Sequence, residues 1–185
     1  PEDILQKLKT QSVKADILTF RQRIPESKPT FKYFLEWDNA AALPIKNYEY
    51  WLKHQLHQNP RNKLRISQKK GVIIEICEFD DNLISEIMDI YNESPVRQNK
   101  KFSDYGWTVE EMKTGRSTVF DRSNFICAFF KNELIGFVKL VNSDRYARTM
   151  SLLSKIAHRD KAPMNLLLAK AVEVCANNKM PYLVY

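Results

Sequence analysis

The chain has 185 residues, of which 44% are hydrophobic and 28% are charged, with a formal net charge of +7 at pH 7. This length is enough for one domain with a full hydrophobic core, and the composition is that of an ordinary globular protein. No run of apolar residues is long enough to span a membrane, so the sequence predicts no transmembrane helix.

The first part of the chain alternates extended and helical patterns. A helix is expected at 3–9, and β-type runs are expected at 15–20 (ADILTF) and 31–37 (FKYFLEW). A further extended piece at 40–45 contains Pro44, which restricts it to an edge or an end of a sheet. These segments predict a small N-terminal α/β extension over residues 1–45.

Two helices are expected next, at 47–57 and from Asn59-Pro60 to about Lys69. From residue 71 onward the order is β-α-α-β-β-β-α-β. The strands are expected near 71–78, 125–130, 134–141, 148–156 and 181–185, and the helices after Asp80, near 108–118 and at 163–177. We therefore expect an α/β (α+β) domain at 46–185, in which a mixed sheet is flanked by helices.

Local capping and turn signals support this order. Asp80 is placed to cap the helix that follows it, and Thr108 and Glu111 form a capping-box pattern. The run FICAFFKNELIGFVKLV is two apolar strands joined by a tight polar turn, which predicts an antiparallel hairpin. The two last strands are joined by a helix and are expected to be parallel.

The cysteines and histidines give no metal-binding pattern. The chain has three cysteines and three histidines. Each cysteine lies in an apolar run without CxxC spacing, so we expect reduced core thiols, a cytoplasmic location and no metal cofactor.

A basic stripe covers residues 46–70, where Glu49 is accompanied by seven lysines and arginines. Such a stripe is able to bind phosphate groups or nucleic acid, including tRNA. A solvated helix face is the simpler interpretation of the same pattern. The sequence leaves both open.

The segment SKIAHRDKAPMNLLLAKAVEVC, at 154–175, passes from a strand through a basic loop into a helix. A helix N-terminus offers unpaired N–H donors and partial positive charge, which suits a phosphate. His158, Arg159 and Lys161 precede this N-terminus, and Asn165 lies in its first turn. Either these residues form an anion-binding loop, or the loop is a capped helix start with a solvated, charged corner.

The element order resembles the core of the GNAT acyltransferase superfamily, short of its last helix and two strands. Two segments, RNKLRISQKKGVIIEICEFDDNLISEIMDIYNESPVRQ (61–98) and APMNLLLAKAVEVCANNKMPYLVY (162–185), resemble the FemAB-like branch. The resemblance covers about residues 45–185. It implies transfer of an acyl group from acyl-CoA or acetyl-CoA, or from aminoacyl-tRNA, to the amine of a small molecule or peptide.

The resemblance also implies where the donor binds. In GNAT proteins the pantetheine arm lies where two parallel strands diverge, here 148–156 and 181–185, and the diphosphate lies at the start of the intervening helix. His158, Arg159, Lys161 and Asn165 would then be donor-binding residues. GNAT enzymes usually carry an Arg/Gln-x-x-Gly-x-Gly/Ala loop at this place, whereas HRDKAPMN contains no glycine.

Further candidates lie outside this loop. Glu93, in YNESPVRQ, is a candidate general base for an attacking amine, with Arg97 beside it as a substrate-binding residue; a helix cap or surface pair is the alternative. Glu36, Trp37 and Asp38 are candidates for an acceptor pocket, with an edge strand entering a turn as the alternative.

Three functions compete: an acyl-CoA dependent transferase, an aminoacyl-tRNA dependent transferase, and a binding domain that keeps the fold without the chemistry. Because the resembled fold continues past the strand at 181–185, we expect the native chain to extend beyond Tyr185. The open side of that strand would then be frayed or would pair with another chain in a homo-oligomer.

Overall fold

The computed structural model describes residues 2–11, 16–22, 24–116, 118–143 and 145–185. Its contacts divide the chain into an N-terminal unit, Pro1–Asn39, and a second unit, Ala40–Tyr185. The two units are described separately below. The expected boundary after residue 45 stays a prediction, but residues 42–44 form a strand of the second unit's sheet.

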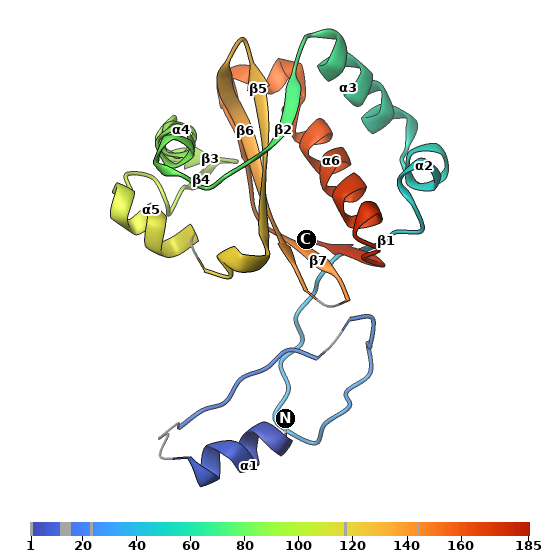
Figure 1. The fold of residues 1–185 in the computed structure, drawn as a ribbon, viewed down its shortest axis with the longest axis vertical. Helices are drawn as coiled ribbons and strands as arrows, with labels where there is room; N and C mark the ends of the chain where they lie inside the picture. Colours follow the sequence, from blue (N-terminus) through green and yellow to red (C-terminus); the bar gives the residue numbers. More distant parts are fainter. Residues whose placement is uncertain (1, 12–15, 23, 117, 144) are drawn as a thin grey trace. The chain divides into compact units, whose positions relative to one another are not determined.

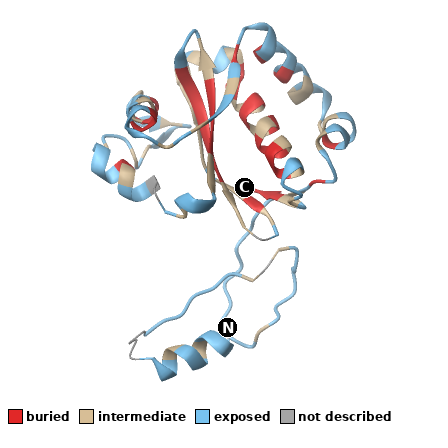
Figure 2. Cartoon of the chain, in the orientation of Figure 1, coloured by how far each residue is buried: buried red, intermediate tan, exposed pale blue. Residues whose placement is uncertain are grey.

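The N-terminal unit contains one helix, α1 (Glu2–Thr10), which confirms the helix expected there. No strand forms at 16–20 or at 31–37, so the two strands expected in this region are wrong; residue 15 lies outside the described residues. β-type residues form strands when a partner strand and a buried face are present. None of the described residues before Pro44 is buried, and Figure 2 shows this unit without buried segments.

The second unit is built on a six-stranded sheet in the order β1-β8-β7-β6-β5-β2 (Figure 1). Its strands are β1 (Ala42–Pro44), β2 (Ile73–Cys77), β5 (Ser123–Phe130), β6 (Glu133–Asn142), β7 (Ala147–Ser154) and β8 (Tyr182–Val184). β7 and β8 are parallel, and the other neighbouring pairs are antiparallel. The expected strands, the 125–141 hairpin and the parallel last pair are thus confirmed.

Helices cover both faces of the sheet (Figure 1). They are α2 (Tyr48–Tyr50), the π-helix η1 (Trp51–Gln55), α3 (Gln58–Lys69), α4 (Asp81–Tyr91), α5 (Val109–Arg116), the 3-10 helices η2 (Phe120–Arg122) and η3 (Ile156–Lys161), and α6 (Pro163–Asn177). The short strands β3 (Val96–Arg97) and β4 (Lys100–Lys101) form a separate two-stranded sheet. Within the chain as described, no helix is long and apolar enough to cross a membrane.

The core has two parts, one on each face of the sheet. Residues of α6 and α3, with Trp51, pack on one face, and residues of α4 and Met112 of α5 pack on the other. β6 contributes to both, because Ile135 and Val138 belong to the first cluster and Leu134 and Phe137 to the second. A central strand covered on both faces is apolar along most of its length, which explains the run LIGFVKLV.

The expected caps are present. The Asp80 carboxylate accepts a hydrogen bond from Leu83 N at 2.8 Å and begins α4. Thr108 N donates to the Glu111 carboxylate at 2.7 Å, and Glu111 N donates to Thr108 Oγ1 at 3.3 Å, so the capping box begins α5.

The open side of β8 is occupied by a strand of the same chain. Leu43 lies opposite Leu183 in antiparallel register, and Ala41 and Tyr185 exchange backbone hydrogen bonds of 3.1 and 3.0 Å. The expectation that residues 181–185 fray or pair with another chain is therefore wrong. Pro44 stands at the end of the edge strand β1, as its missing N–H predicts.

Candidate functional site

β7 and β8 run side by side for a short distance and then separate. Their parallel pairing joins Ala147 to Leu183 and Arg148 to Val184, and Thr149 Oγ1 donates to Val184 O at 3.4 Å. Among the described residues, no strand pairs with the rest of β7, from Thr149 to Ser154, on that side. The unpaired stretch leads through η3 to the start of α6. An extended molecule laid along it would meet free backbone donors and acceptors on one strand.

A β-bulge lies where the two strands separate. Lys139 of β6 lies opposite Ser151 and Leu140 lies opposite Thr149, so Met150 has no partner residue on β6. A bulge redirects the backbone groups of the bulged strand, and bulges are common beside active sites. The bulge has no signal in the sequence, because MSLLS has the pattern of a regular strand.

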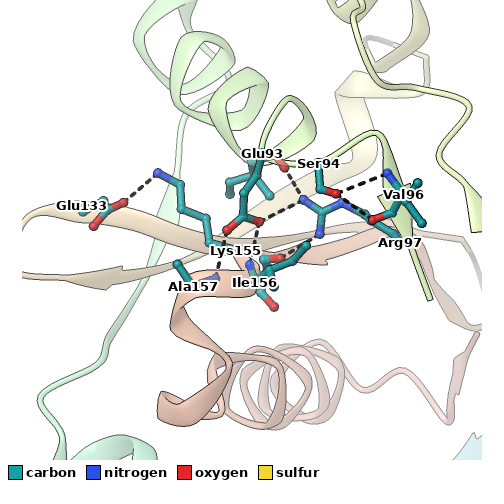
Figure 3. Close-up of polar contacts among 10 residues, drawn as sticks. Glu93, Ser94, Val96, Arg97, Glu133, Lys155, Ile156 and Ala157 are labelled. Atoms are coloured by element: carbon teal, nitrogen blue, oxygen red, sulfur yellow. Dashed lines mark hydrogen bonds and ion pairs between the residues drawn. The ribbon is translucent and has the colours of Figure 1, made fainter. Parts of the chain in front are cut away.

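Glu93, just after α4, joins that helix to the segment following β7 (Figure 3). One carboxylate oxygen accepts a hydrogen bond from Ile156 N at 2.6 Å, and the other accepts one from Ala157 N at 2.9 Å. Arg97 Nη2 donates to the same carboxylate at 3.3 Å. The first two amides of η3 are therefore bound by a carboxylate of the protein itself.

Arg97 completes this junction. Its guanidinium donates to Ser154 O at 3.0 Å and to Ile90 O, and it lies 5.2 Å from the centroid of the Phe102 ring. Its side chain is 11% exposed, and burial lowers its pKa, against the opposing effect of Glu93. Arg159 also lowers the pKa of Arg97, so its positive charge lies within electrostatic reach. We call Glu93 and Arg97 the Glu93–Arg97 clamp.

His158 points toward the turn between β5 and β6. Its Nε2 lies 3.2 Å from one oxygen of Glu133, and Lys155 Nζ lies 2.7 Å from the other. The hydrogen bond from Lys155 is the main cause that holds the pKa of Glu133 below its ordinary value. His158 therefore has a protein partner, contributed by a segment distant in sequence.

Lys161 and Asp160 form a second charged group at the end of η3. The Asp160 carboxylate lies 2.9 Å from Lys70 Nζ and 3.2 Å from Lys161 Nζ, and both contacts lower its pKa. Lys161 Nζ also lies 4.7 Å from the centroid of the Phe130 ring. Arg159 is exposed, and no ion pair joins it to another described residue.

The start of α6 is not capped by a side chain. Ala162 precedes it with φ of 51°, and Pro163 occupies the first turn, where it has no N–H to offer. Asn165 is half-buried, and its backbone N–H donates to Ala162 O at 3.2 Å. The four predicted donor-binding residues thus lie around one helix start, but His158 and Lys161 already contact carboxylates.

The predicted acceptor residues fall in different units. Arg97 is part of the clamp, whereas Glu36, Trp37 and Asp38 lie in the N-terminal unit. Asp38 is paired with Arg21 at 2.8 Å, and Trp37 is exposed. The structure therefore brings Arg97 and Glu93 together. Glu36, Trp37 and Asp38 belong to the N-terminal unit.

Two residues of this region escaped the sequence analysis. Glu133 reads as a polar residue of a hairpin turn, and its partners Lys155 and His158 are 22 and 25 positions away. Lys139 lies inside an apolar strand run, yet it is 2% exposed and its Nζ donates to Thr118 O at 2.7 Å. Only the fold reveals these partners.

The cysteines do not form a reactive site. Cys77, Cys127 and Cys175 are free thiols, and burial raises the pKa of Cys175 to about 12 and that of Cys127 further. Thiols with such pKa values stay protonated at neutral pH and are poor nucleophiles. Among the described residues, no cluster of histidine, cysteine and acidic side chains is arranged to hold a metal ion.

No family model and no curated protein matches this chain. Among solved structures, it is similar to the C-terminal domain of a proposed lysylphosphatidylglycerol synthetase from Agrobacterium fabrum, with a TM-score of 0.58 and 12% identity. The match covers 79% of this chain and 45% of that one. L-PGS from Bacillus licheniformis gives a TM-score of 0.55 and 10% identity over 79% of this chain and 46% of its own.

A third similar structure is a GCN5-related glucosamine N-acetyltransferase region of a fungal multi-domain β-N-acetylglucosaminidase. Its TM-score is 0.50 with 15% identity, over 62% of this chain and 13% of that one. The chain thus spans less than half the length of each of these proteins. At these identities the comparisons establish the fold, which is that of the GCN5-related N-acetyltransferases, as the sequence resemblance implied.

Proposed function

We propose that this protein transfers an acyl group from an activated donor to an amine. The observation that supports the proposal best is the separation of β7 from β8, which leaves the Thr149–Ser154 edge, beside the start of α6, without a partner strand in the described part of the chain. An extended donor arm is able to form strand-like hydrogen bonds there. We interpret this edge as a donor site because the fold is that of an acyltransferase superfamily.

The chemistry proposed for this edge is positioning and electrostatic stabilisation. A backbone N–H of β7 near the Met150 bulge would donate to the carbonyl oxygen of the acyl group as negative charge develops on it. The acceptor amine would attack the carbonyl carbon directly, so that the new C–N bond forms as the bond from this carbon to the sulfur or oxygen of the donor breaks, and the proton of the amine passes to that leaving group or to water. No nucleophile of the chain is required, in keeping with the protonated state of the buried thiols.

We assign Glu93 to holding the backbone rather than to proton transfer. Its carboxylate already accepts hydrogen bonds from two amides and from Arg97. A general base needs a free acceptor directed at the attacking amine. The clamp would instead fix the end of β7 and the start of η3, so that the donor meets a rigid edge.

The residues around η3 fit an acyl-CoA diphosphate only in part. Arg159 is an exposed cation at the correct end of the site, and Asn165 is nearby in sequence. However, the Ile156 and Ala157 amides are bound by Glu93, Pro163 has no N–H, and Asp160 adds negative charge. Acyl-CoA or acetyl-CoA remains the first candidate donor on the resemblance alone.

Aminoacyl-tRNA is the second candidate donor, and the contacts of η3 favour it. α3 exposes Lys63, Arg65 and Lys69, and no acidic residue lies between Glu49 and Glu75 to neutralise them. Such a face suits an RNA backbone, and it needs no diphosphate loop. The name of the Agrobacterium fabrum protein, which describes an aminoacylated lipid as product, agrees with this donor class. The acceptor in this chain would be an amine of a small molecule or peptide, and the location cytoplasmic.

A binding experiment separates the two donors. The chain is titrated with acetyl-CoA and, separately, with aminoacylated and uncharged tRNA at two salt concentrations. Thermal stabilisation by acetyl-CoA that is lost in Arg159→Ala/Lys161→Ala supports the first donor. Salt-sensitive binding of tRNA that is weakened by Lys63→Ala/Lys69→Ala supports the second. A chain that binds neither donor would support the third possibility, a domain that keeps the fold without the acyl-transfer chemistry and binds some other partner.

A further inference from the structure

The outer edge of β2 is open. β2 stands at one end of the sheet and pairs through all five of its residues with β5, without a register shift (Figure 1). Within the described part of the chain, no other strand pairs with it. Natural edge strands usually carry charged side chains, a proline or a bulge that hinders pairing; Ile73–Cys77 has no proline, lysine or bulge, and Glu75 is its one charged residue.

The side chains of this edge are unusually apolar. Ile73 is 58% exposed and Ile76 is 52% exposed. The two side chains lie on opposite faces of the sheet, so each face has an exposed isoleucine at this edge. Ile74 and Ile76 lie opposite Ala128 and Ile126, which belong to the α6 side of the core. Cys77 packs in the α4 side of the core, so Ile73 and Glu75 share that face.

We propose that the β2 edge pairs with the β2 edge of a second copy, in antiparallel register about a two-fold axis through Ile74. This inference does not depend on the proposed acyl transfer. In this register Ile74 faces Ile74 of the second copy and Val72 faces Ile76, whereas Lys70 and Gly71 lie in the turn that ends α3, outside the extended stretch. Ile73 faces Glu75 on the opposite face of the sheet.

The neighbouring registers are less favourable. Side chains that lie opposite each other must share a face, so the axis has to pass through a residue. An axis through Glu75 would place two glutamates opposite each other, which is destabilising. An axis through Ile73 would pair only Val72, Ile73 and Ile74, because the turn at Lys70 and Gly71 ends the extended stretch. The register about Ile74 pairs the whole stretch from Val72 to Ile76 and places apolar side chains opposite each other on one face of the sheet.

The association should be weak and dependent on concentration. One pair of short strands buries far less than the roughly 1,600 Å² of a typical stable interface. The whole chain is therefore studied by sedimentation velocity over a wide range of concentrations. We expect a monomer that converts to a dimer as concentration rises. Ile76→Lys should weaken the dimer at least about tenfold, because an ammonium would face Val72 of the second copy.

Val109→Lys is the matched control, because Val109 is an exposed apolar residue of α5 rather than of the sheet edge. It should leave the association unchanged. A chain that stays monomeric at all concentrations overturns the proposal. So does a dimer that Ile76→Lys does not weaken, because it would use another surface.

Disulfide trapping tests the register itself. Chains carrying Ile73→Cys are mixed with chains carrying Glu75→Cys under mild oxidation with diamide. Both positions are exposed, and the two new thiols should lie opposite each other only in the mixture. Each variant alone places its thiols two positions out of register, about 8 Å apart or more, which is too far for a disulfide. Cross-linking of Ile73→Cys alone, or of Glu75→Cys alone, overturns the register about Ile74. The wild-type chain measures the background from its own cysteines.

Discussion

Single carboxylates organise the region around η3. Glu93 binds the first amides of η3, Glu133 binds Lys155 and His158, and Asp160 binds Lys70 and Lys161. The three carboxylates tie this region to three different elements: Glu93 follows α4, Glu133 begins β6, and Asp160 contacts Lys70 just after α3. The basic character of the segment HRDK therefore serves in large part to fix the segment in place, and Arg159 is the cation that stays available to a ligand.

The clamp predicts a large loss of stability when Arg97 is shortened. Arg97→Ala removes the donors to Ser154 O and Ile90 O and leaves Glu93 without its cation, so the free energy of unfolding should fall by about 3 kcal/mol. Urea unfolding measures this. Arg65→Ala, on the exposed face of α3, is the control and should change stability little. Equal effects of the two changes would show that the clamp has no structural role.

The lowered pKa of Glu133 predicts a pH dependence of stability. A carboxyl with a lowered pKa in the folded state stabilises the fold above its ordinary pKa of 4.5, and this contribution disappears as pH falls. Glu133→Gln should therefore lower the melting temperature at pH 7, and the difference from wild type should shrink between about pH 5 and pH 3. Thermal unfolding at a series of pH values tests this. A difference that is independent of pH would contradict it; Glu110→Gln, on exposed α5, is the control.

The sequence could predict which residues gather at the start of α6 but not which of them are free. The order strand, loop, helix places His158, Arg159 and Lys161 there by chain connectivity alone. Their partners Glu133 and Lys70 lie in other elements, and only the packing of those elements brings them close. In the sequence Glu93 is an isolated carboxylate in a polar loop, a pattern that fits a general base and equally a helix cap or a surface pair.

At the scale of elements, the helices and the central strands followed from periodicity and caps. β5 and β6 are long apolar runs, β2 is a short one, and β7 mixes apolar with polar residues; all four lie close to the predicted ranges. The segments 16–20 and 31–37 failed because β-type composition does not supply a partner strand. η3 falls in a segment for which the sequence predicts a loop, since short 3-10 helices have no periodic signal.

The contact between β6, β7 and α6 depends on a glycine. A Cβ at Gly136 would lie 3.0 Å from Ser154 Cβ, 3.1 Å from Leu153 O and 3.2 Å from Leu167 Cδ1. Gly136→Ala should therefore push the end of β7 away from β6 and lower stability by about 1–3 kcal/mol. Because Ser154 ends the proposed donor edge, donor binding should weaken as well. Unfolding and donor titration of the same variant measure both effects, and a variant with wild-type values in both would contradict the tight contact.

At the scale of the whole molecule, the two units differ in how they are stabilised. The second unit has a two-sided core around its sheet, whereas the described residues before Pro44 include none that is buried. Phe34 is 91% exposed and Trp37 is 73% exposed. A segment of fewer than about 40 residues rarely builds a stable core of its own. The stability of the fold should therefore reside in the second unit.

The strand β1 marks where the second unit must begin. It covers the open side of β8 through residues 42–44, and Ile45 N adds a hydrogen bond of 2.8 Å to Pro181 O. Ile45 itself belongs to the buried core. A chain shortened to residues 40–185 keeps all of these contacts, whereas a chain shortened to 46–185 loses them and exposes an apolar strand edge.

These two truncations test the division of the chain. The 40–185 chain should unfold cooperatively with a midpoint in urea close to that of the full chain, because none of the described side chains that it loses is buried. The 46–185 chain should lose about 3 kcal/mol, on the order of three net backbone hydrogen bonds, and should aggregate through the uncovered edge of β8. Urea unfolding and light scattering follow the two effects. If the 40–185 chain unfolds as easily as the 46–185 chain, the first 39 residues contribute contacts to the fold that their exposed side chains do not suggest, and the boundary at Asn39 would have to be abandoned.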